Sequence, residues 1–143
     1  MLNIALVLFV VGNSLISGIF FIFSNTIMKA LKESAPKHNC QIMKDINRII
    51  INPAFMLLFL TTPLLAVFLL FSSSFASLFL NLATIVHIIG VFGITVTQNV
   101  PRNNRLEKTD DYWKTYLKEW TFWNHIRTIS AILSTIFAVL YLL

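Results

Sequence analysis

Four long apolar stretches alternate with polar segments along the chain. They cover Leu2–Phe23, Pro53–Phe71, Phe75–Gln98 and Trp123–Leu143. Each contains the roughly 20 residues that a helix needs to cross a bilayer. This pattern predicts an all-α integral membrane protein, an up-and-down four-helix bundle that forms one domain over residues 1–143.

The polar segments between these stretches carry helical patterns of their own. Residues 38–50 place isoleucines on one side and charges on the other, which predicts a short amphipathic helix at the membrane interface. Residues 110–123 space aromatic side chains at helical intervals and predict a second such helix. Asn52 and Pro53 are typical of an N-cap and a first helical residue. The short connection at 72–74 predicts an antiparallel hairpin of the second and third spans.

Composition and charge support a membrane protein and set its expected orientation. The 143 residues are 57% hydrophobic and 12% charged, and the mean hydropathy is +0.77. Lysines and arginines gather in the two long connections, so by the positive-inside rule these loops are cytoplasmic and both termini lie outside a bacterial-type inner or plasma membrane. The net charge of +5 is spread among acids over both loops. We therefore expect the lipid bilayer as a partner and no nucleic acid.

Two polar residues lie near the centre of their spans, Asn13 in the first and His87 in the third. A polar group in lipid is costly, so an intramembrane histidine is a candidate functional residue. The alternative is a neutral His87 that hydrogen-bonds Asn13 or a threonine and holds helices together. Both interpretations stay open at this point.

A second set of polar side chains gathers at the cytoplasmic ends of the spans. Asparagines cap helices and arginines extend to headgroups, which explains any one of these residues. The presence of many polar side chains at this one end instead favours a polar layer that closes an apolar cavity. The set comprises Asn47, Asn52, Gln98, Asn99, Asn103, Asn104, Asn124, His125 and Arg127.

Two motifs in this region resemble a known family. They are NVPRNNRL, residues 99–106, and WKTYLKEWTFWNHIRT, residues 113–128. With GIFFIFSNTIMKAL, INRIIINPAF and GVFGITVTQNVPRNN, they resemble the anthrone-oxygenase-like family of small integral membrane proteins over nearly the whole chain. The resemblance implies oxidation of an anthrone to an anthraquinone by molecular oxygen, without a known cofactor.

Such chemistry needs a base, donors for a developing oxyanion and a dry pocket for a flat ring system. We expect His125 to be the base, with Asn124 on the same helical arc. Arg127 is either an electrostatic stabiliser or a headgroup anchor. Asn99, Asn104, Asn124 and His125 are expected to face a shared hollow. The predicted substrate-binding residues are Asn99, Asn103, Asn104, Asn52, Trp120, Trp123, Thr128, His87 and Asn13.

Other functions fit the sequence to different degrees. A non-catalytic membrane module that binds a lipophilic ligand or a partner membrane protein would use the same residues as an enzyme, and a homo-oligomer is compatible with either. Proton-coupled transporters need an intramembrane carboxylate, which the predicted spans lack. A haem held by His87 and His125 is disfavoured by their different depths. The sequence shows no metal-ligand spacing and a single cysteine, Cys40, so we expect no metal site.

Overall fold

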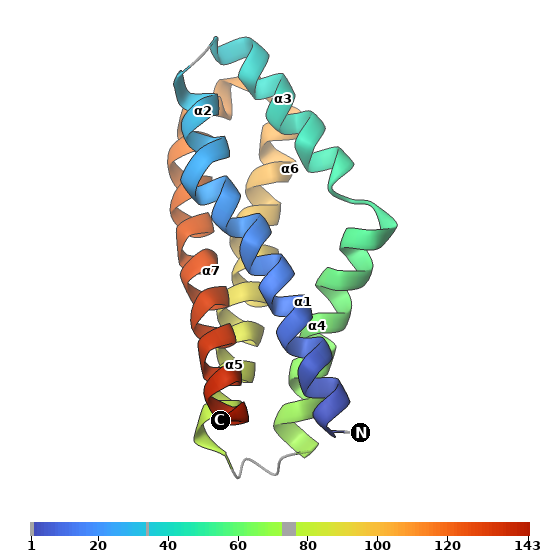
Figure 1. Cartoon of the computed structure of the whole chain (residues 1–143). Coiled ribbons are helices and arrows are strands. Elements are labelled where there is room, and N and C mark those ends of the chain that lie inside the picture. Colours follow the sequence, from blue (N-terminus) through green and yellow to red (C-terminus); the bar gives the residue numbers. More distant parts are fainter. Residues whose placement is uncertain (1, 34, 73–76) are drawn as a thin grey trace.

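The computed structural model describes residues 2–33, 35–72 and 77–143, and these residues are almost entirely helical. Four long helices run antiparallel to their neighbours, which confirms the predicted all-α bundle (Figure 1). The first helix comprises α1 (Leu2–Ile22), a π-helical segment (Phe23–Ile27) and α2 (Met28–Glu33). The second helix is α4 (Pro53–Ser72), and α3 (Pro36–Ile49) connects the first helix to it.

The other two long helices follow in the chain. The third helix comprises α5 (Leu78–Val86), two π-helical segments (His87–Gly93 and Thr95–Asn99) and α6 (Val100–Lys108). The fourth helix comprises a 3₁₀ turn (Asp110–Tyr112) and α7 (Trp113–Leu142).

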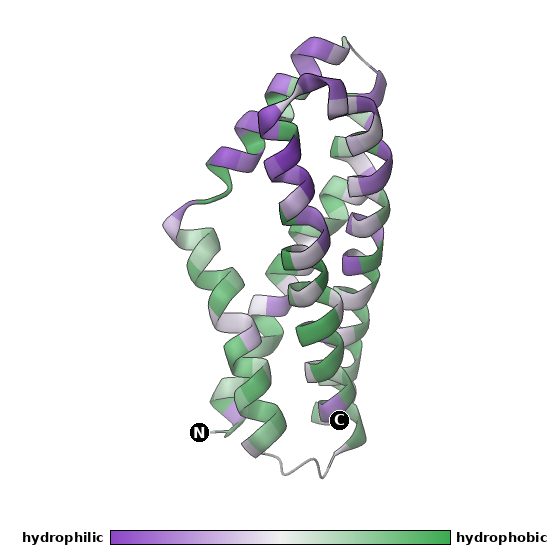
Figure 2. Cartoon of the chain, turned by 180° about the vertical axis from the view of Figure 1, so that it is seen from behind, coloured by the Kyte–Doolittle hydropathy of each residue, from purple (hydrophilic) through white to green (hydrophobic). Residues whose placement is uncertain are grey.

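All four long helices have the length and apolar composition of membrane spans. They cover Leu2–Glu33, Pro53–Ser72, Leu78–Lys108 and Asp110–Leu142, and so contain the predicted spans except positions 75–77 and 143. Positions 75 and 76, like the connection at 73–74, lie outside the described residues. Large apolar side chains cover the outer faces of the helices, and Figure 2 shows hydrophobic residues along most of their length. The chain is therefore a membrane protein whose apolar outer surface suits lipid. The single domain over residues 1–143 stays a prediction.

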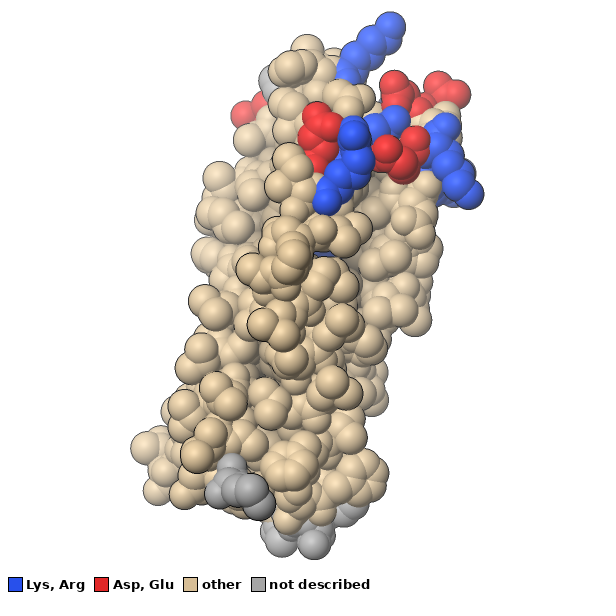
Figure 3. Space-filling model, turned by 90° about the vertical axis from the view of Figure 1, so that its right-hand side faces the viewer, with Lys and Arg blue, Asp and Glu red and all other residues tan. Residues whose placement is uncertain are grey.

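The two ends of the bundle differ in charge. Figure 3 shows the lysines, arginines and acidic residues gathered at one end, which we call the charged end and which comprises α2, α3, α6 and the first turns of α7. Both chain termini lie at the opposite end (Figure 1). The two polar connections thus lie on the same side, as predicted. Their cytoplasmic location stays a prediction.

The two predicted interfacial helices have different outcomes. α3 is a separate helix that begins at Pro36 and buries Asn39, Cys40 and Met43 against the bundle. Residues 113–123 instead belong to α7, which continues without interruption from Trp113 to Leu142. No glycine or proline lies within α7, so nothing in its sequence separates the aromatic segment from the apolar span.

The junction between α3 and α4 has the predicted cap. The backbone N–H of Phe55 donates to Asn52 Oδ1 at 3.0 Å, and Pro53 is the first residue of α4. This arrangement satisfies a backbone donor that the start of a helix leaves free. Asn52 is exposed and serves as the cap, so its side chain is already engaged.

The third helix contains two π-helical segments that the sequence pattern did not predict. The hydroxyls of Thr95 and Thr97 donate to the carbonyl oxygens of Val91 and Gly93, at 2.6 and 2.8 Å. Such hydroxyl bonds compete with the regular backbone ladder. Gly90 permits close contact with α7, because the Ser130 side chain occupies the space that a Cβ at this position would need. π-helical segments often occur at functional sites, and Thr95 lies in one of them.

A buried polar cluster holds three helices together in the half of the bundle that contains the termini. His87 Nδ1 lies 2.8 Å from Asn13 Oδ1, and Asn13 Nδ2 donates to Ala131 O at 3.0 Å and to Thr135 Oγ1 at 2.9 Å. The ring of Phe9 packs edge-on against His87 at 5.3 Å between centroids. One of the two interpretations of His87, a hydrogen bond to Asn13 or a threonine, is confirmed by this contact. His87 Nε2 has no hydrogen-bond partner among the residues that the structure describes. We call Asn13, His87 and Thr135 the closed polar cluster.

Candidate functional site

A cavity of about 470 Å³ lies toward the charged end of the bundle. This volume is within the roughly 300–1,000 Å³ that is typical of small-molecule sites. Its wall is mostly apolar, with several amides and three charged groups. The lining residues are Ile19, Phe20, Phe23, Met43, Ile46, Asn47, Arg48, Ile50, Ile51, Phe55, Met56, Phe59, Thr95, Val100, Asn103, Asn104, Glu107, Trp120 and Arg127.

Arg127 is the buried cation of this cavity, with 5% of its surface exposed. Its Nε–H donates to Asn124 Oδ1 at 2.8 Å and its Nη1 to Thr95 Oγ1 at 3.4 Å. The guanidinium carbon lies over two aromatic rings, 3.9 Å from the centroid of Phe20 and 4.9 Å from that of Trp120. These contacts orient the group and stabilise its charge in part.

No carboxylate in the described part of the chain forms an ion pair with Arg127. The two hydrogen bonds also leave guanidinium N–H donors without a partner among these residues. A buried charge without a counter-ion is costly, and charged residues in such positions are normally paired. The arrangement can therefore hold an anion, and the open side of the group faces a space large enough for one.

Asn124 fixes the position of Arg127. Its Nδ2 donates to Phe20 O at 2.9 Å and to Ser24 Oγ at 2.6 Å. The Ser24 hydroxyl in turn lies 3.0 Å from that of Thr128. Since both amide hydrogens of Asn124 are used, its oxygen is the atom that meets Arg127. Asn124 and Thr128 are buried and do not line the cavity, so they support the guanidinium from behind.

Polar contacts between the third and fourth helices repeat every four residues on the third. Thr95 accepts from Arg127; Asn99 Nδ2 donates to Trp120 O at 3.3 Å. The Tyr116 hydroxyl donates to Asn103 Oδ1 at 2.9 Å. Thr95 and Asn103 are eight residues apart on the third helix, or about two turns. Since both line the cavity, its polar groups lie at two levels, with Arg127 at one and Asn103 at the other.

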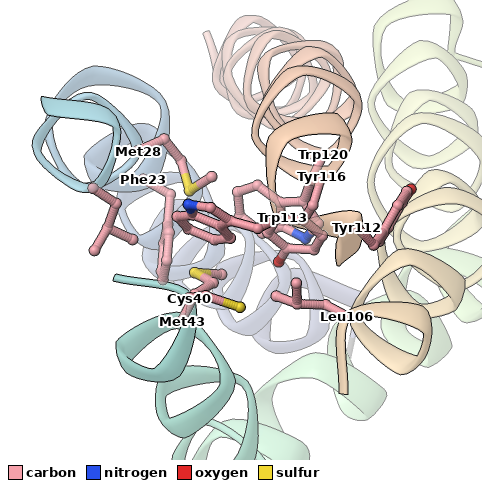
Figure 4. Close-up of a cluster of buried hydrophobic side chains, with 10 residues drawn as sticks. Phe23, Met28, Cys40, Met43, Leu106, Tyr112, Trp113, Tyr116 and Trp120 are labelled. Atoms are coloured by element: carbon pink, nitrogen blue, oxygen red, sulfur yellow. The ribbon is translucent and has the colours of Figure 1, made fainter. Parts of the chain in front are cut away.

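The aromatic residues at the start of α7 form one buried cluster with α2, α3 and α6. Figure 4 shows Trp113, Tyr116 and Trp120 from α7 beside Cys40 and Met43. The rings of Tyr116 and Trp120 stack at 5.9 Å between centroids. This packing holds Trp120 rigidly as a wall of the cavity and beneath the guanidinium of Arg127.

Comparison with known proteins identifies the family once this geometry is known. The family model described as anthrone oxygenase matches residues 48–137. The chain belongs to the anthrone oxygenase family. The matched region contains the cavity residues of α4, the third helix and α7, including Asn103 and Arg127. No curated protein and no solved structure matches the chain.

The predicted site residues of this anthrone oxygenase family member fall into three groups. Asn103, Asn104, Trp120 and Arg127 line the cavity. Asn99, Asn124 and Thr128 are buried beside it. Outside the lining are His125 and Trp123, the cap Asn52, and His87 and Asn13 of the closed polar cluster.

The expected inward orientation of His125 is wrong, because the structure places this side chain on the exposed face of α7. Side chains two positions apart on an α-helix point in directions that differ by about 200°. Since Arg127 faces the cavity, His125 faces outward. Burial likewise argues against Arg127 as a headgroup anchor, because its guanidinium lies inside the bundle.

Most of the apolar lining was not among the predicted site residues, and neither were Phe20, Thr95 and Tyr116, which contact Arg127 or Asn103. Asn47 was predicted only as a member of the polar set at the ends of the spans. Thr95 lies one helical turn before Asn99, and Tyr116 one turn before Trp120. Residues four apart share a helix face, so this spacing could have predicted that Thr95 and Tyr116 lie beside the predicted site residues. Phe20 comes from the first span and gives no sequence signal of its own.

Charged side chains at the mouth of the cavity are paired. Arg48 Nε lies 3.7 Å from Glu107 Oε1, and both side chains are more than half exposed. Farther from the cavity, Lys44 forms an ion pair with Asp110 at 2.6 Å, and Cys40 Sγ lies 3.7 Å from the same carboxylate. Burial, with the nearby Asp110 charge, raises the pKa of the Cys40 thiol. Within residues 2–33, 35–72 and 77–143, no group of three or more His, Cys, Asp or Glu side chains is arranged to hold a metal ion.

Proposed function

We propose that this protein is a membrane-embedded oxygenase that oxidises a lipophilic phenolic or polycyclic substrate, such as an anthrone or a quinol, with molecular oxygen and without a cofactor. Membership of the anthrone oxygenase family and the four apolar helices support the general class. The observation that carries the proposal is the buried Arg127, which has no carboxylate partner among the described residues and borders an apolar cavity. Such a cation is suited to an oxyanion that forms on an apolar substrate.

The proposed reaction begins with loss of a proton from the substrate. In an anthrone this proton comes from the ring CH₂ group, and the resulting enolate carries its negative charge on oxygen. Arg127 stabilises that oxygen and so lowers the pKa of the substrate. The proton passes to water at the mouth of the cavity, where Glu107 is exposed.

Oxygen then reacts with the enolate. One electron passes to O₂, the resulting radicals combine at the ring carbon, and a proton completes a hydroperoxide. Loss of water from the hydroperoxide gives the quinone carbonyl. The balance is one CH₂ group and one O₂ converted to one C=O group and one H₂O. Phe20, Phe55 and Phe59 line the apolar part of the cavity, which suits both O₂ and a flat ring system.

The location of the cavity also fits a substrate from the bilayer. Ile50, Ile51 and Phe55 line it at the junction between α3 and α4, where Ile51 is exposed. In our proposal the charged end is cytoplasmic, both termini are outside, and the substrate enters from the adjacent leaflet at this junction.

The test is oxygen consumption by the purified chain in lipid vesicles that contain a hydroxylated anthrone. We expect one O₂ consumed per quinone formed, at a rate well above that in matched vesicles without protein. Binding of the anthrone without faster oxidation would contradict the proposal and favour the non-catalytic ligand-binding module.

A further inference from the structure

We infer that Arg127 is a binding site for a small monovalent anion, such as a halide or thiocyanate, which pairs with the guanidinium when no substrate is bound. Under the proposed function the same ion competes with the substrate oxyanion, so inorganic anions inhibit the protein. Only this competition rests on the proposed function. The site itself can be measured without any aromatic ligand.

The acidic residues of the chain do not neutralise Arg127. All six lie within the residues that the structure describes. Glu33 and Asp111 are exposed. The other four form ion pairs with other basic side chains, and they are Asp45, Glu107, Asp110 and Glu119. Burial of a charge without a counter-ion is costly, so an anion that enters the cavity from solution is stabilised at Arg127.

One side of the guanidinium can meet an ion. Its Nε–H and Nη1 donate to Asn124 and Thr95, whereas its Nη2 forms no hydrogen bond with the described residues. Thr95 donates its own hydroxyl hydrogen to Val91 O and so offers no donor to a ligand. The indole N–H of Trp120, whose ring lies against the guanidinium, also has no partner among these residues. The cavity wall thus has unpaired N–H donors, which suits a ligand that only accepts hydrogen bonds.

The surroundings of Arg127 favour an anion that loses its hydration water easily. The rings of Phe20 and Trp120 lie 3.9 and 4.9 Å from the guanidinium carbon, and most of the cavity lining is apolar. A single positive charge in such a wall compensates poorly for the hydration that a divalent anion such as sulfate would lose. A guanidinium is itself weakly hydrated, which suits a weakly hydrated partner. We therefore expect thiocyanate and iodide to bind more tightly than chloride, and sulfate to bind least.

Anions can reach this site from the charged end of the bundle. The chain has 11 lysine and arginine residues and 6 acidic residues, and Figure 3 shows these charges gathered at that end. The excess of positive charge raises the local concentration of anions. Arg48 and Glu107 line the cavity and are both more than half exposed, so the cavity is open toward this end.

Infrared absorption by thiocyanate provides the test, because the C≡N stretching band of this ion responds to its surroundings. The full chain in nanodiscs of neutral phosphatidylcholine is titrated with sodium thiocyanate, and empty nanodiscs are the reference. We expect a second band that saturates. Iodide should displace the bound ion, whereas sodium sulfate at equal ionic strength, the control for screening, should not. Absence of a saturable band, or equal displacement by sulfate and iodide, would overturn the inference.

Variants assign the bound ion to Arg127. Arg127→Gln should remove the saturable band, and Arg127→Lys should weaken binding by about threefold to tenfold because an ammonium is more strongly hydrated. Arg105→Gln is the matched control and should bind as the wild type does, because Arg105 is exposed and stacks on Tyr112 outside the cavity. A saturable band that persists in a folded Arg127→Gln protein would contradict the assignment.

A second measurement decides the matter if Arg127→Gln fails to fold. Iodide quenches tryptophan fluorescence on contact, and Trp120 lies against the guanidinium of Arg127. In the wild type we expect a component of the quenching that saturates with iodide and is reversed by thiocyanate. Quenching that rises only linearly with iodide would show that no ion binds beside Trp120 and would overturn the inference.

Lipid composition distinguishes a free ion from a lipid headgroup. In nanodiscs that contain phosphatidylglycerol, the half-saturating concentration of thiocyanate should rise by less than about tenfold, which the negative surface potential alone explains. Complete loss of thiocyanate binding in that lipid would assign Arg127 to a headgroup phosphate and overturn the inference.

Assays with a hydroxylated anthrone test the competition. Thiocyanate at about ten times its half-saturating concentration should raise the apparent KM by about tenfold and leave kcat unchanged, as competitive binding requires. Anion binding by a protein that does not oxidise anthrones would retain the site and remove the proposed oxygenase. Anthrone oxidation that thiocyanate does not inhibit would retain the oxygenase and overturn the inferred competition.

Discussion

The bundle contains two buried polar clusters, and they differ in charge and in the space beside them. In the closed polar cluster, Asn13 uses both its amide hydrogens and its oxygen within the bundle. His87 Nε2 has no hydrogen-bond partner among the described residues, but neither Asn13 nor His87 lines the cavity. Around Arg127, by contrast, the charge has no counter-ion among the described residues and part of its hydrogen-bonding capacity is unused. Arg127 and its partner Thr95 both line the cavity.

This difference shows what marks a candidate site in a membrane bundle. Both clusters place polar side chains within membrane spans, which costs free energy in either case. The presence of such a side chain therefore does not distinguish a functional residue from a structural one. The closed polar cluster offsets that cost with bonds between α1, the third helix and α7, which is a structural role. Arg127 combines an unpaired charge with an adjacent space, and this combination is what a ligand-binding role requires.

The largest expected effect is the loss of activity on replacement of Arg127. Arg127→Gln should lower the rate of anthrone oxidation by about 100-fold or more, because loss of one oxyanion donor in a dry site costs roughly 10²–10³ in rate. Oxygen consumption in lipid vesicles measures this rate. Arg127→Lys should retain intermediate activity, and Arg105→Gln should match the wild type. A folded Arg127→Gln protein with full activity would remove the guanidinium from the mechanism.

The second prediction concerns stability in the closed polar cluster. Asn13→Ala removes three hydrogen-bond contacts and leaves His87 Nδ1 unpaired, so we expect a loss of about 1–3 kcal/mol in the free energy of unfolding. Thermal unfolding in detergent, compared with the exposed Asn25→Ala, measures this loss. Activity per folded molecule should stay near that of the wild type. A large loss of activity without loss of stability would assign Asn13 to the reaction and remove the contrast between the clusters.

A smaller effect is expected at Tyr116, which positions Asn103. Tyr116→Phe keeps the stacking on Trp120 and removes the hydroxyl that bonds Asn103 Oδ1. The KM for a dihydroxylated anthrone should rise by about threefold to tenfold, with kcat within about twofold, because one neutral hydrogen bond orients the binding amide. A fall in kcat with unchanged KM would contradict a role in binding alone.

The smallest effect is expected at His125. His125→Ala should change the oxidation rate by less than about twofold, since this side chain is exposed and does not line the cavity. The measurement is the same assay in vesicles, with the exposed His38→Ala as a control for surface changes. A drop of tenfold or more would restore His125 as the base and contradict the outward orientation.

The sequence predicted the architecture because length and hydropathy alone determine which segments can span a bilayer. The four apolar stretches, the Asn52 cap and the common end of the two polar connections follow from local composition and are all present. The contact between His87 and Asn13 was one of two open interpretations. It could be named because each residue lies near the centre of its own span, so the two side chains have the same depth.

The details of the site depended on information that a one-dimensional pattern does not contain. Helical spacing places Arg127 and His125 on different faces, but it does not say which face meets the cavity. Thr95, which contacts Arg127, lies in a π-helical segment that the hydrophobic pattern does not predict. The phenylalanine beneath the guanidinium, Phe20, comes from α1, more than 100 residues away in the chain.

The most direct test of the central claim is an experimental structure of the protein with 2,6-dihydroxyanthraquinone. We expect the ligand within the cavity, with one oxygen at hydrogen-bond distance, about 2.7–3.1 Å, from a guanidinium nitrogen of Arg127. A ligand found elsewhere, or a cavity filled by a lipid chain with Arg127 paired to a headgroup, would contradict it.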